Sequence, residues 1–299
     1  MFLIVGGDSE IGRAAFAALQ AQRQPAASTT RRRDGVAQDR PFLDLGASLD
    51  DWKPPQDVAS ACICAAVARL ADCAADPQGS AYVNVTQTLA LVDKLVSRGV
   101  YVLFLSTNQV FDGNIARVPP KSPHCPVSEY GRQKARTESA LLDQMARAAP
   151  VGILRLAKVV SPHMPLLQRW IADLANGKSI SAFTDMTLAP TEIASVTAAI
   201  SALLSARASG IFQLTGPRDV SYADVGGFLA GRLGVDASLV HASSARSAGL
   251  PEGATPRHTT LDSNELRDRF GLEVPDAWQV IERVTSIDVG ETRTIQNAG

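Results

Sequence analysis

The segment Tyr101-Val102-Leu103-Phe104-Leu105 is followed at once by Ser106-Thr107-Asn108-Gln109-Val110-Phe111-Asp112-Gly113. The first five residues are apolar and rich in β-branched and aromatic side chains, which predicts a buried strand of a parallel sheet. Open α/β sheets bind their ligands at the carboxyl ends of such strands. Ser106 and Thr107 are therefore expected at the edge of the sheet where a ligand lies.

Tyr130 and Lys134 stand four residues apart in a stretch, 129–145, that is typical of a helix, so they share one helix face. A phenol has an unperturbed pKa of about 10, and a nearby ammonium lowers it toward neutrality. The Thr107 hydroxyl can hydrogen-bond the same reacting oxygen. Together the three residues predict proton transfer to a carbonyl while a cofactor supplies hydride, although the Tyr–Lys spacing alone is more often a surface pair.

The first twelve residues predict a dinucleotide site. An apolar run over 2–5 precedes Gly6-Gly7-Asp8-Ser9-Glu10-Ile11-Gly12, and strong helix formers follow. Strand, glycine turn and helix form the context of the dinucleotide fingerprint, in which the helix amino terminus faces the pyrophosphate. Gly6 permits the tight turn and Gly12 allows close packing, while Ser9 takes the middle small position. The alternative is a glycine turn without a ligand.

The expected second strand, 26–30, runs into Arg31-Arg32-Arg33. A fold that prefers NAD usually offers an acid here to the ribose diol, and one that accepts a 2′-phosphate offers arginine. The absence of an acid predicts NADP(H), with NAD(H) as a second possibility. Thr30 and either Arg31 or Arg32 are the expected contacts, and a solvated basic loop is the alternative.

Further apolar segments complete a doubly wound parallel sheet. Strands are expected at 42–45, 58–66, 151–156 and 211–214, and 181–191 reads as a loop. Small side chains at Ala65 and Ala66 leave room for a flat cofactor. The segment 81–98 has the pattern of a helix, and Asn84 near its start either braces the strand beside it or lies on the surface. The sequence predicts an α/β Rossmann-type domain over 1–157 with 192–216 returning to it, a smaller and mostly C-terminal substrate-binding lobe over 158–191 and 217–286, and a disordered tail over 287–299.

Composition excludes several classes of protein. The 299 residues carry a formal net charge of −1, which leaves no large basic footprint for nucleic acid. Four cysteines and four histidines form no metal-ligand spacing, so no metal is predicted. No secretory signal and no apolar stretch long enough for a membrane span are present. We expect a cytoplasmic protein with reduced thiols.

The chain resembles the extended short-chain dehydrogenase/reductases, and within them the dTDP-4-dehydrorhamnose reductase family. The resemblance runs from Gly6 to about Val284. Its carriers are short motifs in a shared order: Gly6…Gly12 with Glu10-Ile11-Gly12, Asp44-Leu45, Ala65-Ala66, Asp76-Pro77 with Asn84-Val85, Ser106-Thr107 through Gly113, Tyr130-Gly131-x-x-Lys134-x-x-x-Glu138, Leu154-Arg155, Asp185 with Pro190-Thr191, Gly210-Ile211-Phe212 to Gly216, Leu261-Asp262, and Phe270-Gly271.

The resemblance implies that the 4-keto group of a nucleotide-linked 6-deoxysugar is reduced with NADPH or NADH. Tyr130 would donate the proton, Lys134 would lower its pKa and hold the nicotinamide ribose, and Thr107 would bond the same oxygen. The expected cofactor-binding residues are Gly6, Ser9, Glu10, Ile11 and Gly12 at the phosphates, Thr30, Arg31 and Arg32 at the 2′-phosphate, Asp44 and Leu45 by the adenine, Ala65 and Ala66 by the central part, and Ser106, Tyr130 and Lys134. The expected substrate-binding residues are Asn108, Val110, Phe111 and Arg155.

Three departures fall where the substrate should bind. Asn108-Gln109 stands where the family has Asp-Tyr, Lys158-Val159-Val160 replaces an aromatic-containing stretch, and Met186 and Leu188 stand where Gln and Gly are usual. Two alternatives therefore stay open. One is a reductase or epimerase-fold enzyme acting on another sugar nucleotide or a small carbonyl compound. The other is a non-catalytic NADP-binding regulatory subunit. Pairing into a homodimer is common in this fold class.

Overall fold

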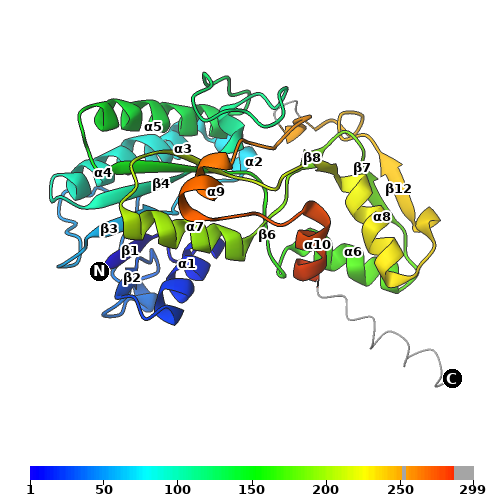
Figure 1. Cartoon of the computed structure of the whole chain (residues 1–299), viewed down its shortest axis with the longest axis horizontal. Helices are drawn as coiled ribbons and strands as arrows, with labels where there is room; N and C mark the ends of the chain where they lie inside the picture. The colour runs from blue at the N-terminus through cyan, green and yellow to red at the C-terminus, as the bar shows by residue number, and fades with distance from the viewer. Residues whose placement is uncertain (251–253, 286–299) are drawn as a thin grey trace.

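A six-stranded parallel sheet occupies one side of the molecule and a smaller lobe the other, as Figure 1 shows. The computed structural model describes residues 1–250 and 254–285. Across the sheet the strands follow the order β10 (Gly210–Leu214), β5 (Val151–Leu156), β4 (Tyr101–Thr107), β3 (Ser60–Ile63), β1 (Phe2–Val5), β2 (Ala26–Ser28). The predicted α/β fold is confirmed. The strand order reverses at β1, between β2 and β3, and such a switch point is where these sheets bind ligands.

Helices cover both faces of the sheet, which explains why every residue of β4 and β5 is buried. Helices α1 (Glu10–Ala21) and α7 (Ile193–Ala206) pack on one face through residues such as Leu19 and Leu203. Helices α4 (Thr88–Val96) and α5 (Glu129–Ala146) cover the other face, with Leu95 and Leu141 fully buried. The other helices are α2 (Leu70–Ala75), α3 (Pro77–Ala81), α6 (Pro165–Ala175), α8 (Tyr222–Leu233), α9 (Asn264–Phe270) and α10 (Ala277–Thr285).

The smaller lobe has its own hydrophobic core, in which α6, α8 and α10 meet short strands (Figure 1). Trp170, Leu229 and Ile281 are central members of this core. The short strands form three pairs: β7 (Ile180–Phe183) with β12 (Val240–Ser243), β8 (Thr187–Leu188) with β11 (Val220–Ser221), and β6 (Val159–Val160) with β9 (Thr191–Glu192). Helix α7 and strand β10 lie with the large sheet, while the predicted domain boundaries stay predictions. The expected disordered tail, 287–299, lies outside the described residues.

Two segments differ from the predicted elements. The expected strand at 42–45 is reduced to a single bridge between Thr30 and Phe42. Pro41 has no N–H to extend the pairing, and Asp44 turns the chain by accepting a hydrogen bond from Gly46 N at 2.8 Å. The expected loop at 181–191 contains β7, β8 and the start of β9. The alternation of buried and exposed side chains in β7 is a strand signal too short to recognise among polar residues.

Candidate active site

The carboxyl end of β4 and the first turn of α5 are in contact, which brings the predicted reacting groups to one place. Ser128 caps α5 by accepting a hydrogen bond from Gly131 N at 3.0 Å. A Cβ at Gly131 would lie 2.1 Å from the main-chain oxygen of Gln109, so only glycine allows this approach. Lys134 reaches back to β4 and donates from Nζ to the carbonyl of Leu105 at 2.8 Å. Its Nζ lies 5.8 Å from the centre of the Tyr130 ring.

The surroundings change the proton affinity of both α5 residues. Burial lowers the pKa of Lys134 to about 8, although Glu138 one turn further raises it. Burial, with a smaller contribution from Cys73, raises the pKa of Tyr130 above its ordinary value. The predicted lowering of the Tyr130 pKa by Lys134 is therefore wrong for this structure, because burial disfavours the phenolate. Tyr130 is held as the neutral phenol, which is the form of a proton donor.

Thr107 has a structural role as well as its predicted catalytic one. Its hydroxyl accepts a hydrogen bond from Gln109 N at 3.2 Å and so caps the 3₁₀ helix η3 (Asn108–Val110). It also lies 3.4 Å from the side-chain oxygen of Asn108. The Thr107 side chain is 8% exposed and Asn108 is half-buried. The capping bond uses one lone pair of the Thr107 oxygen, while its O–H points toward the Asn108 oxygen.

The glycine turn is packed too closely for a side chain at Gly6 or Gly12. Gly6 has a φ of +90°, which favours glycine. A Cβ at Gly6 would lie 2.7 Å from the main-chain N of Ala65, just after β3. A Cβ at Gly12 would lie 2.2 Å from the main-chain oxygen of Gly6. Ser9 is the N-cap of α1: its Oγ accepts from Gly12 N at 3.0 Å and donates to Gly6 O at 2.8 Å. Ile11 packs its side chain against the core, so only its main chain faces the turn.

A cavity of about 290 Å³ lies at the switch point between the glycine turn and the ends of β2 and β3. It is lined by Val5, Gly6, Asp8, Ser9, Thr29, Arg31, Leu43, Asp44, Leu45, Gly46, Ala65, Ala66, Val67 and Val83. Seven predicted cofactor-binding residues are among them. Glu10, Ile11, Gly12, Thr30, Arg32, Ser106, Tyr130 and Lys134 are not. Of the two arginines between which the sequence left the choice open, Arg31 lines the cavity. Its neighbour Arg33 instead lies over the Phe42 ring at 4.6 Å.

Asp8 is a cavity residue that the sequence analysis missed. Its carboxylate accepts hydrogen bonds from the Thr30 hydroxyl at 3.0 Å, from Arg31 N at 3.1 Å and from Arg40 Nη2 at 2.6 Å. Burial alone would raise the pKa of Asp8, but these hydrogen bonds and the Arg40 charge hold it below its ordinary value. The only available signal was a charged residue inside a glycine turn, and its partners are 22 to 32 positions away.

Glu10 lies at the amino terminus of α1, where its side-chain oxygen accepts a hydrogen bond from Ser161. Ser161 directly follows β6, so this bond connects the glycine-turn helix with the segment that leads into the smaller lobe. Burial lowers the pKa of Lys158 in the same segment, and Glu10 opposes that shift. Glu10 therefore faces the lobe in this structure rather than the cavity.

Three of the predicted substrate-binding residues are core residues. Val110 and Phe111 are 0% and 5% exposed and pack against Val118, Ala135 and Leu261. Arg155 is 1% exposed, and its guanidinium donates to Glu138 at 2.6 Å, Pro120 O at 2.8 Å and Gln213 at 3.1 Å. An arginine that is buried and paired in this way has no group left for a substrate, so these three assignments are corrected. Val110 and Phe111 were expected to bind substrate but belong to a small core instead.

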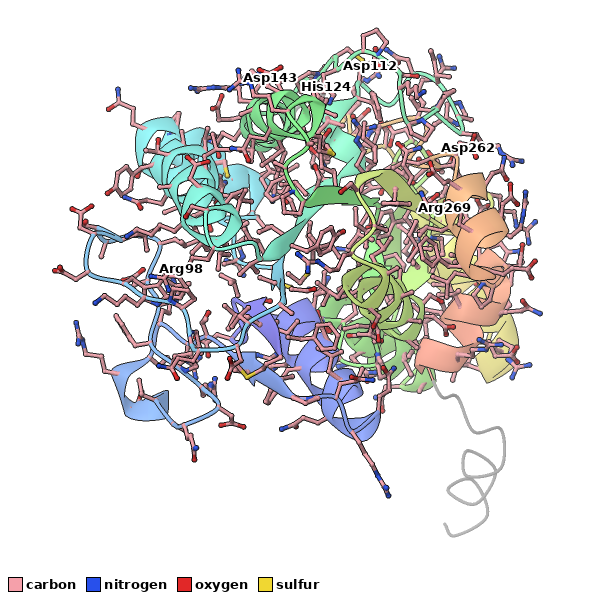
Figure 2. The ribbon with its side chains drawn as sticks, turned by 60° about the vertical axis from the view of Figure 1, so that its left-hand side comes forward. Arg98, Asp112, His124, Asp143, Asp262 and Arg269 are labelled. Atoms are coloured by element: carbon pink, nitrogen blue, oxygen red, sulfur yellow. The ribbon has the colours of Figure 1, made fainter. Side chains whose placement is uncertain are left out.

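The Arg155–Glu138 pair holds α5, β5 and the long loop before α5 together. His124, from that loop, contacts Glu138 Oε2 at 2.8 Å. Figure 2 shows His124 beside α5, on the side where the loop carrying Asp112 runs. Burial would raise the pKa of Glu138, but hydrogen bonds from His124 and Arg155 and the Arg155 charge lower it. Glu138 follows Lys134 by one helical turn, so the network supports the helix that carries the reacting pair.

Asn84 braces Val67, a cavity residue in the loop after β3, rather than the strand itself. Its side-chain oxygen accepts from Val67 N at 2.8 Å, and its amide donates to Gln133 on α5 at 2.7 Å. Asn84 lies in the π-helical turn η2 (Tyr82–Gln87), where the predicted continuous helix over 81–98 is locally widened. The widened turn directs the amide toward β3's exit. Asn84 thus links α5 to the Val67 side of the cavity.

Two kinds of feature are absent from residues 1–250 and 254–285. No group of three or more histidine, cysteine, aspartate or glutamate side chains there could hold a metal ion. No helix within those ranges is both long and apolar enough to cross a membrane.

Residues 1–287 match the family model described as "RmlD substrate binding domain". A probable low-salt glycan biosynthesis reductase of Haloferax volcanii is 29% identical over 71% of this chain and 72% of its own length. A dTDP-4-keto-6-deoxy-D-glucose reductase of Streptomyces niveus is 27% identical over 93% of this chain and 90% of its own length. Both relatives thus align with the greater part of the chain.

The fold is shared with solved reductase structures. A dTDP-4-dehydrorhamnose reductase of Bacillus anthracis, solved in complex with NADP, superposes with a TM-score of 0.78. The two chains are 17% identical, and the match covers 95% of this chain and 97% of the other. At this level of identity the likeness shows the fold.

Proposed function

Because the chain belongs to the RmlD substrate binding domain family, we propose that it is a reductase of the 4-keto group of a nucleotide-linked 6-deoxysugar. NADPH or NADH would supply the hydride. The observation that carries the proposal is the contact between the Tyr130–Lys134 face of α5 and the end of β4, at the same carboxyl edge of the sheet as the cavity at the switch point.

The residues around the cavity fit a dinucleotide. Gly6 and Gly12 have no room for a Cβ, which leaves the main chain at the α1 amino terminus free to approach a pyrophosphate. Asp44 and Leu45 would lie against the adenine half, and Arg31 would meet the phosphate-bearing ribose. Ala65 and Ala66 also line the cavity, and their small side chains would leave room for the central part of the cofactor.

Side chains of the protein would supply the proton for the reduction. Tyr130 is a neutral phenol because burial raises its pKa, so it can donate to the carbonyl oxygen as negative charge develops there. Lys134 would stabilise the resulting phenolate, since its ammonium is anchored to Leu105 O beside the Tyr130 ring. The capped Thr107 hydroxyl would orient the same oxygen.

The curated relatives support the substrate class. The Streptomyces niveus relative is named for reduction of a dTDP-linked 4-keto-6-deoxysugar, and its match spans nearly the whole chain. The residues that differ from the family pattern, such as Asn108, Gln109 and Lys158, lie after β4 and β5 and would adapt the site to a particular sugar and nucleotide.

The test is oxidation of NADPH and of NADH, followed by loss of reduced-nicotinamide absorbance, with a panel of dTDP-, GDP- and UDP-linked 4-keto-6-deoxysugars. Turnover with one member, lost in Tyr130→Phe while dinucleotide affinity is kept, is the expected result. Dinucleotide binding without turnover on any member would contradict the proposal and favour a non-catalytic subunit. Equal turnover by the wild type and Tyr130→Phe would show that Tyr130 is not the proton donor.

A further inference from the structure

The carboxylate of Asp8 lies at the end of β2, although Asp8 belongs to the turn after β1. Three donors from the segment 30–40 converge on it: the Thr30 hydroxyl, the main-chain N–H of Arg31 and the guanidinium of Arg40. The Asp8 side chain is 18% exposed and Arg40 is 37% exposed. A partly desolvated carboxylate with this many donors is an anion seated in an anion-binding site.

The same place is where this type of fold distinguishes its two dinucleotides. A carboxylate at the end of the second strand accepts hydrogen bonds from the ribose diol of NADH, whereas arginine accommodates the 2′-phosphate of NADPH. The residues directly after β2, 29–33, include three arginines and no acid, but the fold adds the Asp8 carboxylate from the turn after β1. Asp8 and Arg31 line the same cavity, as does Asp44 further along it. Because Asp8 also accepts the hydrogen bond from Arg31 N, an acid and a base lie side by side at the end of β2.

We propose that Asp8 is a specificity-determining residue of the cofactor site, because its carboxylate occupies the anion-binding groups at the end of β2. The inference rests on the proposed dinucleotide function. A 2′-phosphate would have to compete with Asp8 for Thr30, Arg31 N and Arg40, and it would bring negative charge beside a carboxylate. The diol of NADH meets neither obstacle. Asp8 therefore lowers the preference for NADPH that the arginines alone would give.

The Asp8→Asn variant tests the effect of the Asp8 charge separately from that of its size. Asparagine keeps the size and one acceptor oxygen for the Thr30 and Arg31 donors, and it removes the charge. The dissociation constants of NADPH and NADH are measured by direct titration of the wild type and the variant. We expect the NADPH affinity to rise relative to NADH by about tenfold or more. The same comparison with 2′,5′-ADP and 5′-AMP should show the gain for 2′,5′-ADP alone.

Asp39→Asn is the matched control, since Asp39 is an exposed acid of the same loop and its side chain bonds none of the described residues. It should leave the ratio of the two affinities unchanged. Arg40→Met is a second variant that does not depend on the folding of the first. It removes the cation that neutralises Asp8, so NADPH should weaken several-fold relative to NADH.

The outcomes separate the two claims. If both dinucleotides bind the wild type and Asp8→Asn leaves their affinity ratio within about twofold, the specificity inference is overturned. An equal loss of both affinities overturns it as well, because Asp8 would then only support the turn. If neither dinucleotide binds the wild type, the proposed function fails first.

Discussion

Replacing Lys134 by methionine tests whether the buried ammonium of the proposed active site lowers the free energy of unfolding. Lys134 is 3% exposed, and burial lowers the pKa of its ammonium from 10.5 to about 8. One pKa unit corresponds to about 1.4 kcal/mol, so the charged group costs the folded protein about 3 kcal/mol near neutral pH. Methionine is uncharged and similar in length, but it gives up the hydrogen bond to Leu105 O, worth about 1 kcal/mol. We expect Lys134→Met to raise the free energy of unfolding by about 2 kcal/mol and to abolish turnover.

The pH dependence gives this prediction a distinct signature. The pKa of Lys134 is lower in the folded than in the unfolded chain, so the unfolded state binds more protons between about pH 8 and 10.5. The wild type should therefore gain stability as the pH rises through that window. Lys134→Met lacks the titrating group, so its advantage should be complete below about pH 8 and should narrow above it.

The assay is guanidinium chloride unfolding without cofactor, followed by circular dichroism at a series of pH values. Lys94→Met is the matched control, because Lys94 also donates to a main-chain carbonyl, Asp50 O at 3.1 Å, but in an exposed setting. It should change the stability by less than about 0.5 kcal/mol. A Lys134→Met protein less stable than the wild type near neutral pH, or a stability gap that stays constant from pH 8 to 10.5, would refute the reasoning.

Three further predictions concern other parts of the site. Glu138→Gln leaves a buried arginine unpaired and should lower the free energy of unfolding by about 3 kcal/mol, whereas Glu129→Gln in an exposed pair should cost less than about 1 kcal/mol; similar losses in urea unfolding would contradict this. Because the pKa of Glu138 is lowered, its contribution should be lost on acidification through its folded pKa, and Glu138→Gln should show less acid sensitivity than the wild type. Thr107→Val should lower kcat/KM by a factor that corresponds to a loss of roughly 2–4 kcal/mol of transition-state stabilisation, and Thr107→Ser should keep most of the activity. If Thr107→Val leaves kcat/KM unchanged, Thr107 only caps η3. Arg31→Ala should weaken NADPH binding more than NADH binding in direct titrations, whereas Arg32→Ala should leave both affinities unchanged. If Arg31→Ala weakens both dinucleotides equally, Arg31 does not contact the 2′-phosphate.

The sequence predicted the central strands and the glycine turn because the patterns that indicate them are local. A run such as 101–105 has the composition of a strand buried on both faces, and the structure buries all of β4. The glycine turn was equally readable, since Gly6 and Gly12 are required by close contacts that no other residue permits. Short strands of the lobe, such as β8 with two residues, carry too little pattern to be recognised without their partners.

The site was harder to predict because its electrostatics depend on distant residues. Nothing local to Asp8 shows that Arg40, 32 positions away, pairs with it at 2.6 Å. The pKa of Tyr130 was predicted in the wrong direction because the sequence shows the neighbouring lysine but not the burial of the phenol. Arg155 was expected among the substrate-binding residues. Its partner, Glu138, lies on α5, 17 positions earlier, and the spacing alone does not reveal that pairing.

The most direct measurement uses NADPH or NADH carrying deuterium at the transferable position of the nicotinamide, with the 4-keto-6-deoxysugar nucleotide that supports turnover. The proposal predicts a product one mass unit heavier, with the label on C4 of the sugar, and no labelled product from Tyr130→Phe. Label at another carbon, or a labelled product formed equally well by Tyr130→Phe, would contradict hydride transfer to C4 with Tyr130 as the proton donor.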